Sequence, residues 1–149
     1  MTKQEFIEQA TVEALAAKAR SGFPAGITVA QAALESNFGQ SQLSRTANNY
    51  FGIKSHGKHA AMEFRTCEFG AKGEIKMVAR FAVYTDMAEC FACRDRQIAS
   101  GSVYKDARKE VKDPEQFAFE LAKHWATDPK YAEKLLRIYR ENGFAKLDQ

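Results

Sequence analysis

The chain has 149 residues, 45% of them hydrophobic and 28% charged, and its 22 lysines and arginines exceed its 19 aspartates and glutamates only slightly. This length favours one domain, residues 1–149, that can bury a core without disulfides or metal ions, and the composition excludes wholesale disorder. Basic blocks interleaved with aromatic residues are missing, so we expect no nucleic-acid partner. We also expect a monomer.

The first twenty residues, MTKQEFIEQATVEALAAKAR, predict a helix rather than a secretion signal. Thr2 and Glu5 have the spacing of a capping box. Glutamates interrupt the apolar positions, so no signal-peptide core is present, and no stretch of the chain is apolar over the about 18 residues needed to cross a bilayer. The expected core positions of this helix recur at helical spacing. They are Phe6, Ala10, Val12, Leu15, Ala16 and Ala19.

A short second helix is predicted after the turn-forming segment SGFPAG, with Thr28 as its N-cap and Gly39 as its end. Glu35 lies near the end of this helix among alanines and Leu34. An acid beside apolar groups has a raised pKa and can donate a proton near neutral pH. Glu35 is therefore a candidate general acid, with an ordinary surface glutamate as the alternative.

Polar and aromatic residues follow a short helical turn over residues 41–47. Asn48 and Asn49 can bind hydroxyls and amides, and Tyr50 and Phe51 can stack on the apolar faces of sugar rings. They are candidate substrate-binding residues. The alternative is a loop followed by core aromatics.

The hydrophobic period then changes from helical to alternating. Residues 62–69 and 74–84 alternate on either side of the turn GAKG, which predicts a β-hairpin. Cys90 and Cys93 follow at a spacing that places both on one helical face. A single Cys-x-x-Cys is weak evidence for a metal or redox site, and we expect no metal and no cofactor.

The C-terminal half reads as three helices. The first runs from Asp86 to Ile98 and is followed by a loop, ASGSVY. Asp113-Pro114 and Asp128-Pro129 are matched helix starts, which predict helices over residues 114–124 and 129–141. The fold class is therefore mostly α (α+β): a helical single domain with one inserted β-hairpin.

Three segments together identify a family resemblance: AQAALESNFGQSQLSRTANNYFGIK, RFAVYTDMAECF and WATDPKYAEKLLRIY. They resemble the glucosaminidase-type glycoside hydrolases, the family of bacterial autolysins and of the flagellar rod-associated peptidoglycan hydrolase domain. The likeness covers about Phe6 to Phe144. It implies a lysozyme-like fold whose hairpin flanks a substrate cleft, and cleavage of the β-1,4 bond after N-acetylglucosamine in peptidoglycan glycan strands.

The resemblance also implies roles for individual residues. Glu35 would be the general acid, and Glu68, in TCEF on the hairpin, would be a base that activates water. Glu63 and Glu74 are the local competitors for this second role, and the acetamido group of the substrate is another. Tyr84 would orient the water or that acetamido group, and a tyrosine that packs on the core at the end of the hairpin is the alternative.

Trp125 and Tyr131 match cleft aromatics of the family, although the family usually has Tyr where this chain has Trp125. Core packing is the alternative for both. Two other functions fit the sequence: a muramidase or lytic transglycosylase of lysozyme-like fold, and a noncatalytic wall-binding module. Without a signal peptide, the protein would be made in the cytoplasm and reach the wall, in the periplasm or outside the cell, by another route.

Overall fold

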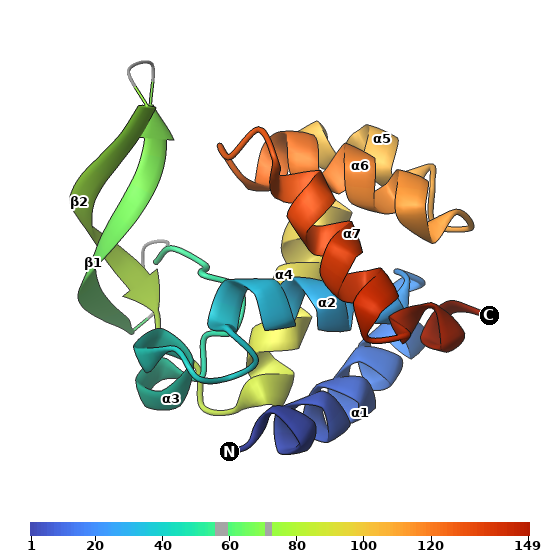
Figure 1. The fold of residues 1–149 in the computed structure, drawn as a ribbon, viewed down its shortest axis with the longest axis horizontal. Helices are drawn as coiled ribbons and strands as arrows, with labels where there is room; N and C mark the ends of the chain where they lie inside the picture. Colours follow the sequence, from blue (N-terminus) through green and yellow to red (C-terminus); the bar gives the residue numbers. More distant parts are fainter. Residues whose placement is uncertain (56–59, 71–72) are drawn as a thin grey trace.

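The computed structural model describes the backbone of residues 1–55, 60–70 and 73–149, and the side chains of all these except residues 64–70 and 73–77. Within this part of the chain the fold is mostly helical with one two-stranded antiparallel hairpin, which confirms the predicted fold class (Figure 1). The elements are α1 (Lys3–Ser21), α2 (Ala25–Ser36), α3 (Gln42–Ala47), β1 (Ala61–Gly70), β2 (Gly73–Ala82), α4 (Met87–Ser100), α5 (Lys105–Arg108), α6 (Pro114–Trp125), α7 (Tyr131–Glu141) and the 3₁₀ segments Ser102–Tyr104 and Phe144–Asp148.

The start of α1 is capped as predicted. The Glu5 amide donates to Thr2 Oγ1 at 3.1 Å, and the Thr2 amide donates to Glu5 Oε2 at 2.9 Å. The buried face is partly different, because Ala14 and Ala17 continue the stripe that Phe6 and Ala10 begin. The predicted core positions Val12 and Leu15 are instead 64% and 45% exposed, since they lie across the helix from that stripe.

The helix α2 begins earlier and ends earlier than predicted. It starts at Ala25 after Pro24, so Thr28 is no N-cap; its hydroxyl donates to the Pro24 carbonyl at 3.1 Å from inside the first turn. The helix ends at Ser36 because Asn37 already adopts a left-handed conformation, with φ at 49°, so Gly39 lies beyond the end.

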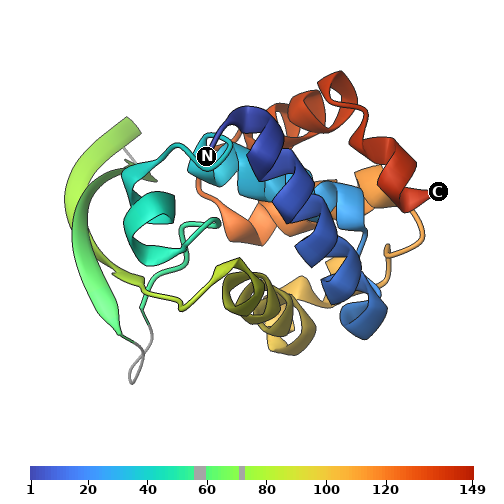
Figure 2. The ribbon, with the colours of Figure 1, turned by 90° about the horizontal axis from the view of Figure 1, so that it is seen from below.

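The same helix forms the centre of the core. Ten of its twelve residues are buried; the other two are Leu34 and Glu35, which face the pocket described below. α1, α7 and the last 3₁₀ segment pack against α2, and α6 also touches it (Figures 1 and 2). Packing at its start is so tight that a Cβ on Gly26 would lie 2.2 Å from the Phe144 carbonyl oxygen.

The β-hairpin is confirmed, with the register running from Ala61 opposite Ala82 to Gly70 opposite Gly73. It stands at one side of the helices and joins them at its base (Figures 1 and 2). There the Ala82 amide donates to the Ile53 carbonyl at 2.9 Å, which ties the strand to the loop that follows α3.

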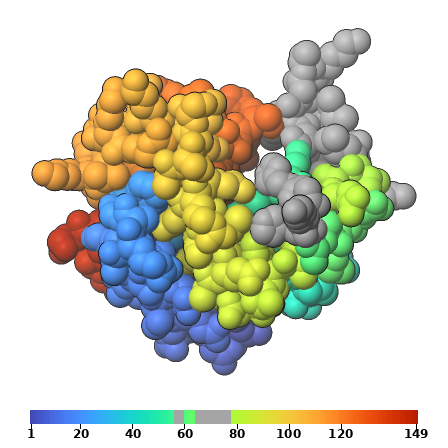
Figure 3. All heavy atoms as spheres, turned by 180° about the vertical axis from the view of Figure 1, so that it is seen from behind, coloured from blue at the N-terminus to red at the C-terminus, as the bar shows by residue number. Residues whose placement is uncertain are grey.

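One of the two predicted aspartate caps in the second half is present: Asp113 accepts from the Gln116 amide at the start of α6, where Pro114 is the first helical residue. The helix predicted from Asp86 starts at Met87, and Asp86 caps it by accepting from the Glu89 amide. The prediction for Asp128 is wrong: α7 begins at Tyr131, not at Pro129, and Asp128 accepts from the Lys130 amide in the turn before the helix. The predicted loop ASGSVY contains a 3₁₀ turn that leads into α5. Figure 3 shows α4 on the rear surface beside α1 and α6.

Among the described helices, none combines the length and the apolar character required to span a bilayer.

Candidate active site

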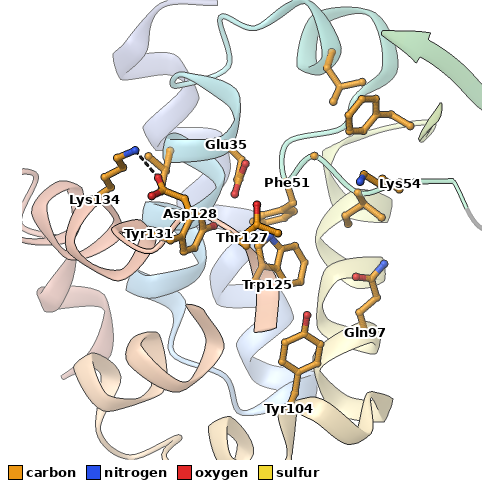
Figure 4. Close-up of a pocket in the computed structure, with 16 residues that line it drawn as sticks. Glu35, Phe51, Lys54, Gln97, Tyr104, Trp125, Thr127, Asp128, Tyr131 and Lys134 are labelled. Carbon is orange, nitrogen blue, oxygen red and sulfur yellow. Dashed lines mark hydrogen bonds and ion pairs between the residues drawn. The ribbon is translucent and has the colours of Figure 1, made fainter. Parts of the chain in front are cut away.

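A pocket of about 650 Å³ opens where the end of α2 meets the start of α7 and the loop after α3 (Figure 4). α3, β2, α4, the 3₁₀ segment Ser102–Tyr104 and the end of α6 with the segment after it contribute the rest of its walls. Its lining among the described residues consists of Leu34, Glu35, Leu43, Phe51, Gly52, Ile53, Lys54, Phe81, Gln97, Tyr104, Trp125, Ala126, Thr127, Asp128, Tyr131 and Lys134. The pocket therefore gathers residues from 34 to 134 around one cavity.

Glu35 points into this pocket from the last turn of α2 (Figure 4). Burial raises its pKa from the ordinary 4.5 to about 7, and the nearby Tyr131 hydroxyl offsets part of that rise. The carboxyl group is thus shielded enough to hold its proton near neutral pH, yet it lines an open cavity. This is the arrangement that a general acid needs.

Gly52 lets the main chain pass close to this acid. Its φ is +64°, and a Cβ built on it would lie 3.6 Å from Glu35 Oε2. A side chain here would add apolar atoms against the carboxyl group and strain the backbone. The glycine of the NNYFGIK motif therefore forms one wall of the acid's environment.

Aromatic rings form a row along the pocket. Phe51 and Trp125 meet edge to face, with ring centroids 6.4 Å apart, and Trp125 lies 6.2 Å from Tyr104. Trp125 and Tyr104 are partly exposed, whereas Phe51 is 1% exposed and also packs on Phe91 in the core. Partly exposed rings of this kind can stack on the apolar faces of sugars.

A charged pair borders the cavity on the α7 side. Lys134 Nζ donates to Asp128 Oδ2 at 2.5 Å, and the Lys130 amide donates to Asp128 Oδ1 at 2.9 Å. These hydrogen bonds lower the pKa of Asp128. Asp128 is therefore an ionised carboxylate that accepts hydrogen bonds from Lys130 and Lys134, and not a second proton donor.

Several predicted substrate-binding residues lie outside the pocket lining. Asn48 donates to the Tyr84 carbonyl at 3.1 Å, and the side chain of Asn49 donates to the Ile53 and Ala82 carbonyls, both at 2.9 Å. Tyr50 is 6% exposed and packs in the core. The two asparagines connect the loop after α3 to the base of the hairpin. They therefore support the site without lining the pocket.

Tyr84, the predicted third catalytic residue, also lies outside the lining. It is 3% exposed, and its hydroxyl donates to Cys93 Sγ at 3.1 Å. Cys90, one turn earlier, accepts from the Tyr50 amide at 3.3 Å, and burial raises its pKa to about 12. Both cysteines thus contact tyrosine-bearing segments beneath the site, and their thiols are free.

Glu68, the predicted base, lies on β1 opposite Ile75 and two residues before the end of the strand. Its side chain and that of its competitor Glu74 lie outside the described residues. Glu63 is an exposed residue nearer the base of the hairpin.

Sequence reasoning did not identify Gly52, Lys54, Gln97, Tyr104 or Thr127 as pocket residues, although the structure brings them there. The NNYFGIK motif contained a signal for the first two. Tyr104 belongs to a segment read as a loop, and Gln97 resembles any polar helix residue.

Comparison with known proteins agrees with the motifs. The sequence model of the family described as mannosyl-glycoprotein endo-beta-N-acetylglucosaminidase (Glucosaminidase) matches residues 11–144. Peptidoglycan hydrolase FlgJ of Pseudomonas aeruginosa is 32% identical over 92% of the chain, and exo-glucosaminidase LytG of Bacillus subtilis is 32% identical over 83%. The chain spans only 36% and 45% of the lengths of these two relatives.

Solved structures agree at the level of the fold. A peptidoglycan hydrolase mutant from Sphingomonas sp. A1 superposes with a TM-score of 0.86 at 30% identity, over 97% of each chain. The resemblance seen in the sequence is thus confirmed by a family match over most of the chain and by a shared fold. The chain belongs to the glucosaminidase family of glycoside hydrolases.

Proposed function

We propose that this chain hydrolyses the β-1,4 bond after N-acetylglucosamine in peptidoglycan glycan strands, with Glu35 as the general acid. The observation that carries the proposal is the shielded carboxyl group of Glu35, whose pKa of about 7 keeps it protonated at the wall of an aromatic-lined pocket. The names of the relatives, a peptidoglycan hydrolase and an exo-glucosaminidase, support this substrate class.

The chemistry begins with a sugar held against the partly exposed rings of Trp125 and Tyr104. Glu35 passes its proton to the glycosidic oxygen while the bond from that oxygen to the anomeric carbon breaks, and positive charge develops on the sugar ring. A raised pKa assists this step because the acid is still protonated when substrate binds.

A second group must then deliver water to the anomeric carbon. Asp128, the other carboxylate in the described lining, is held by Lys134 and by the Lys130 amide, which makes it a poor base. The family resemblance of the TCEF segment leads us to assign this role to Glu68 on the hairpin. Glu63, Glu74 and the acetamido group of the substrate are the alternatives.

The test is product analysis of purified peptidoglycan sacculi by mass spectrometry. New reducing ends of N-acetylglucosamine are expected. Reducing muramic acid ends would identify a muramidase, and anhydromuramic ends would identify a transglycosylase; either would contradict the bond assignment but keep Glu35 as the acid.

The acid itself is tested by Glu35→Gln, which removes the proton and preserves the shape. The variant should lose about 100-fold or more in turnover, the scale of general acid catalysis, while circular dichroism stays unchanged. Glu141→Gln, an exposed glutamate outside the pocket, is the matched control and should behave like the parent. Parental turnover by Glu35→Gln would exclude the acid role, whereas a parent protein that shows no turnover of sacculi would favour a noncatalytic wall-binding module.

The base is tested in the same assay by Glu68→Gln, which should lose most activity. An unaffected variant would point to Glu74 or to the acetamido group. If the substrate assignment is right, the protein acts at the bacterial cell wall.

A further inference from the structure

Three polar side chains are buried directly behind Glu35. Gln31 and Arg94 are 0% exposed and Tyr131 is 5% exposed. Each keeps one atom without a hydrogen bond of standard length and angle within the described part of the chain: Gln31 Nε2, Arg94 Nη2 and Tyr131 Oη. Buried polar atoms are nearly always paired, so three unsatisfied atoms beside an acid require an explanation.

Arg94 fixes the orientation of the group, because a guanidinium can only donate. Its Nη1 donates to Thr28 Oγ1 at 2.9 Å and to Asp95 Oδ1 at 2.8 Å, which balances its charge. Its Nε donates to Gln31 Oε1 at 2.9 Å. The oxygen of the Gln31 amide must therefore face Arg94, and its NH₂ group faces away from Arg94.

Gln31 and Glu35 are four residues apart, so they lie on the same face of α2, one turn from each other. The Tyr131 hydroxyl lies near enough to both to affect their electrostatics, although neither contact has standard hydrogen-bond geometry. Burial is the largest cause of the raised pKa of Tyr131; Glu35 adds to the rise and Gln31 offsets part of it. Because the Gln31 NH₂ group can only donate, the Tyr131 oxygen is the acceptor of that pair, and its one hydrogen is left for the Glu35 carboxyl group. The Tyr131 oxygen thus faces the Gln31 NH₂ group while its hydrogen faces Glu35.

We propose that Arg94, Gln31 and Tyr131 form a one-way hydrogen-bond chain that aims the Tyr131 hydroxyl at the Glu35 carboxyl group and holds this acid in position for proton transfer. The proposal rests on the proposed role of Glu35 as general acid. It gives Tyr131 a role as a positioning residue that acts through Glu35, in addition to its place in the pocket wall.

The chain accounts for both states of the acid. While Glu35 is protonated, its carbonyl oxygen accepts from Tyr131, and its own O–H is left to point at the glycosidic oxygen. When that proton leaves, the hydrogen bond from Tyr131 meets a full negative charge and becomes stronger. Tyr131 keeps its proton throughout. The Gln31–Tyr131 and Tyr131–Glu35 contacts lack standard hydrogen-bond geometry in the free protein. Both shorten when the proton leaves Glu35, as catalytic hydrogen bonds often do.

Other charged groups face Glu35 from the elements around it. Lys54 lies on the loop after α3, and Lys134 and Asp128 form their pair at the start of α7. None of the variants below touches these three residues, so their influence on Glu35 is constant across the comparison.

The decisive variant is Tyr131→Phe, which removes the hydroxyl and keeps the ring. We expect kcat to fall by about 10-fold to 100-fold, the scale of a misplaced catalytic group, with KM little changed. We also expect the ¹³C NMR titration of the Glu35 carboxyl group to move to higher pH, because the carboxylate loses a donor.

Tyr139→Phe is the matched control. Tyr139 lies on the same helix, is 3% exposed, and donates to Asp148 Oδ2 at 2.8 Å away from the pocket. It should lose stability, but its kcat and its Glu35 titration should equal those of the parent. A Tyr131→Phe protein with the kcat and the Glu35 titration of the parent would overturn the proposal.

Gln31→Glu is the second variant, and it decides the matter if Tyr131→Phe does not fold. It keeps the oxygen that Arg94 needs but replaces the amide donor with an acceptor, so the Tyr131 hydroxyl turns away from Glu35. The same rate loss is expected, and adding Tyr131→Phe should bring little further loss of activity. The Glu35 titration is not compared in this variant, because the new carboxyl group one turn away shifts it by repulsion. A folded Gln31→Glu protein with the kcat of the parent would contradict the chain.

The two proposals fail in different ways. If Glu35→Gln proves fully active, the general-acid role is wrong, whereas the Glu35 titration in Tyr131→Phe still reports whether the chain reaches this carboxyl group.

Discussion

The shielding of Glu35 makes the stability of the protein depend on pH. In the folded state this group has a pKa of about 7, against an ordinary 4.5, so the folded protein binds the proton more tightly than the unfolded chain. Below about pH 4.5 both states are protonated and Glu35 imposes no penalty. The free energy of unfolding then falls as pH rises towards 7, because the folded state must ionise a shielded acid.

Glu35→Gln should therefore stabilise the protein in alkaline solution. The gain in free energy of unfolding is expected to reach as much as about 3 kcal/mol above pH 7 and to disappear near pH 4. Urea unfolding of parent and variant across this range measures it. A difference that does not change with pH would show that Glu35 titrates normally.

Gly52 is the second residue whose local geometry makes a prediction. Gly52→Ala places a methyl group 3.6 Å from Glu35 Oε2 in a left-handed conformation. The variant should lose about 1–2 kcal/mol of stability and a substantial part of its kcat/KM, since a methyl group now contacts the acid and takes space from the substrate.

Gly143→Ala separates these two effects. Gly143 has a nearly identical φ of +66°, but a Cβ there would meet nothing within 4 Å. Both variants should lose similar stability in thermal unfolding, and only Gly52→Ala should lose activity against sacculi. Equal activities would mean that the space beside Glu35 does not matter.

At the same scale, single residues show what the sequence could reveal. Glu35 could be found because its motif is contiguous and its apolar neighbours are adjacent in the chain. Arg94 could not be found, since a charged residue on an amphipathic helix normally faces water. Its burial depends on Thr28 and Gln31, more than 60 residues away in the chain.

At the scale of secondary structure, the sequence predicted the existence and type of the elements better than their ends. The two Asp-Pro pairs are alike in sequence, yet Asp113 caps α6 and Asp128 holds Lys134 at the pocket. The difference is decided by tertiary partners that a local pattern does not contain. The same holds for Thr28, which lies within α2 because the helix starts at Ala25, directly after Pro24.

The start of α2 has a cap that comes from the other end of the chain. Its Gly26 amide donates to Asp148 Oδ1 at 2.8 Å, and Asp148 Oδ2 accepts from the Tyr139 hydroxyl at 2.8 Å. Pro24, the residue before the helix, provides no side-chain cap. The last 3₁₀ segment thus stabilises the helix that carries the acid.

Asp148→Ala should accordingly lower the free energy of unfolding by about 1–2 kcal/mol, the range of a lost helix cap. Tyr139→Phe, which removes only one of the two hydrogen bonds, should lose less. Chemical denaturation of both variants measures this, and an Asp148→Ala protein as stable as the parent would show that α2 needs no such cap.

At the scale of the whole molecule, the mostly helical domain with one hairpin followed from hydrophobic period and turn residues. The pocket did not, because it forms where segments from residues 34 to 134 converge. The family resemblance predicted a substrate cleft, which hydrophobic periodicity alone could not predict. It did not predict that Asn48, Asn49 and Tyr50 support the site from outside its lining.

The close approach at Gly26 also restricts how this protein can evolve. Even a methyl group there would collide with main-chain and side-chain atoms of the last segment, at 2.2 Å from the Phe144 carbonyl oxygen and 2.6 Å from Asp148 Oδ2. The Phe144 carbonyl oxygen belongs to the main chain, so no substitution at position 144 removes this contact. A side chain at position 26 therefore requires a shift of residues 144–148, so we expect these two segments to change together in evolution.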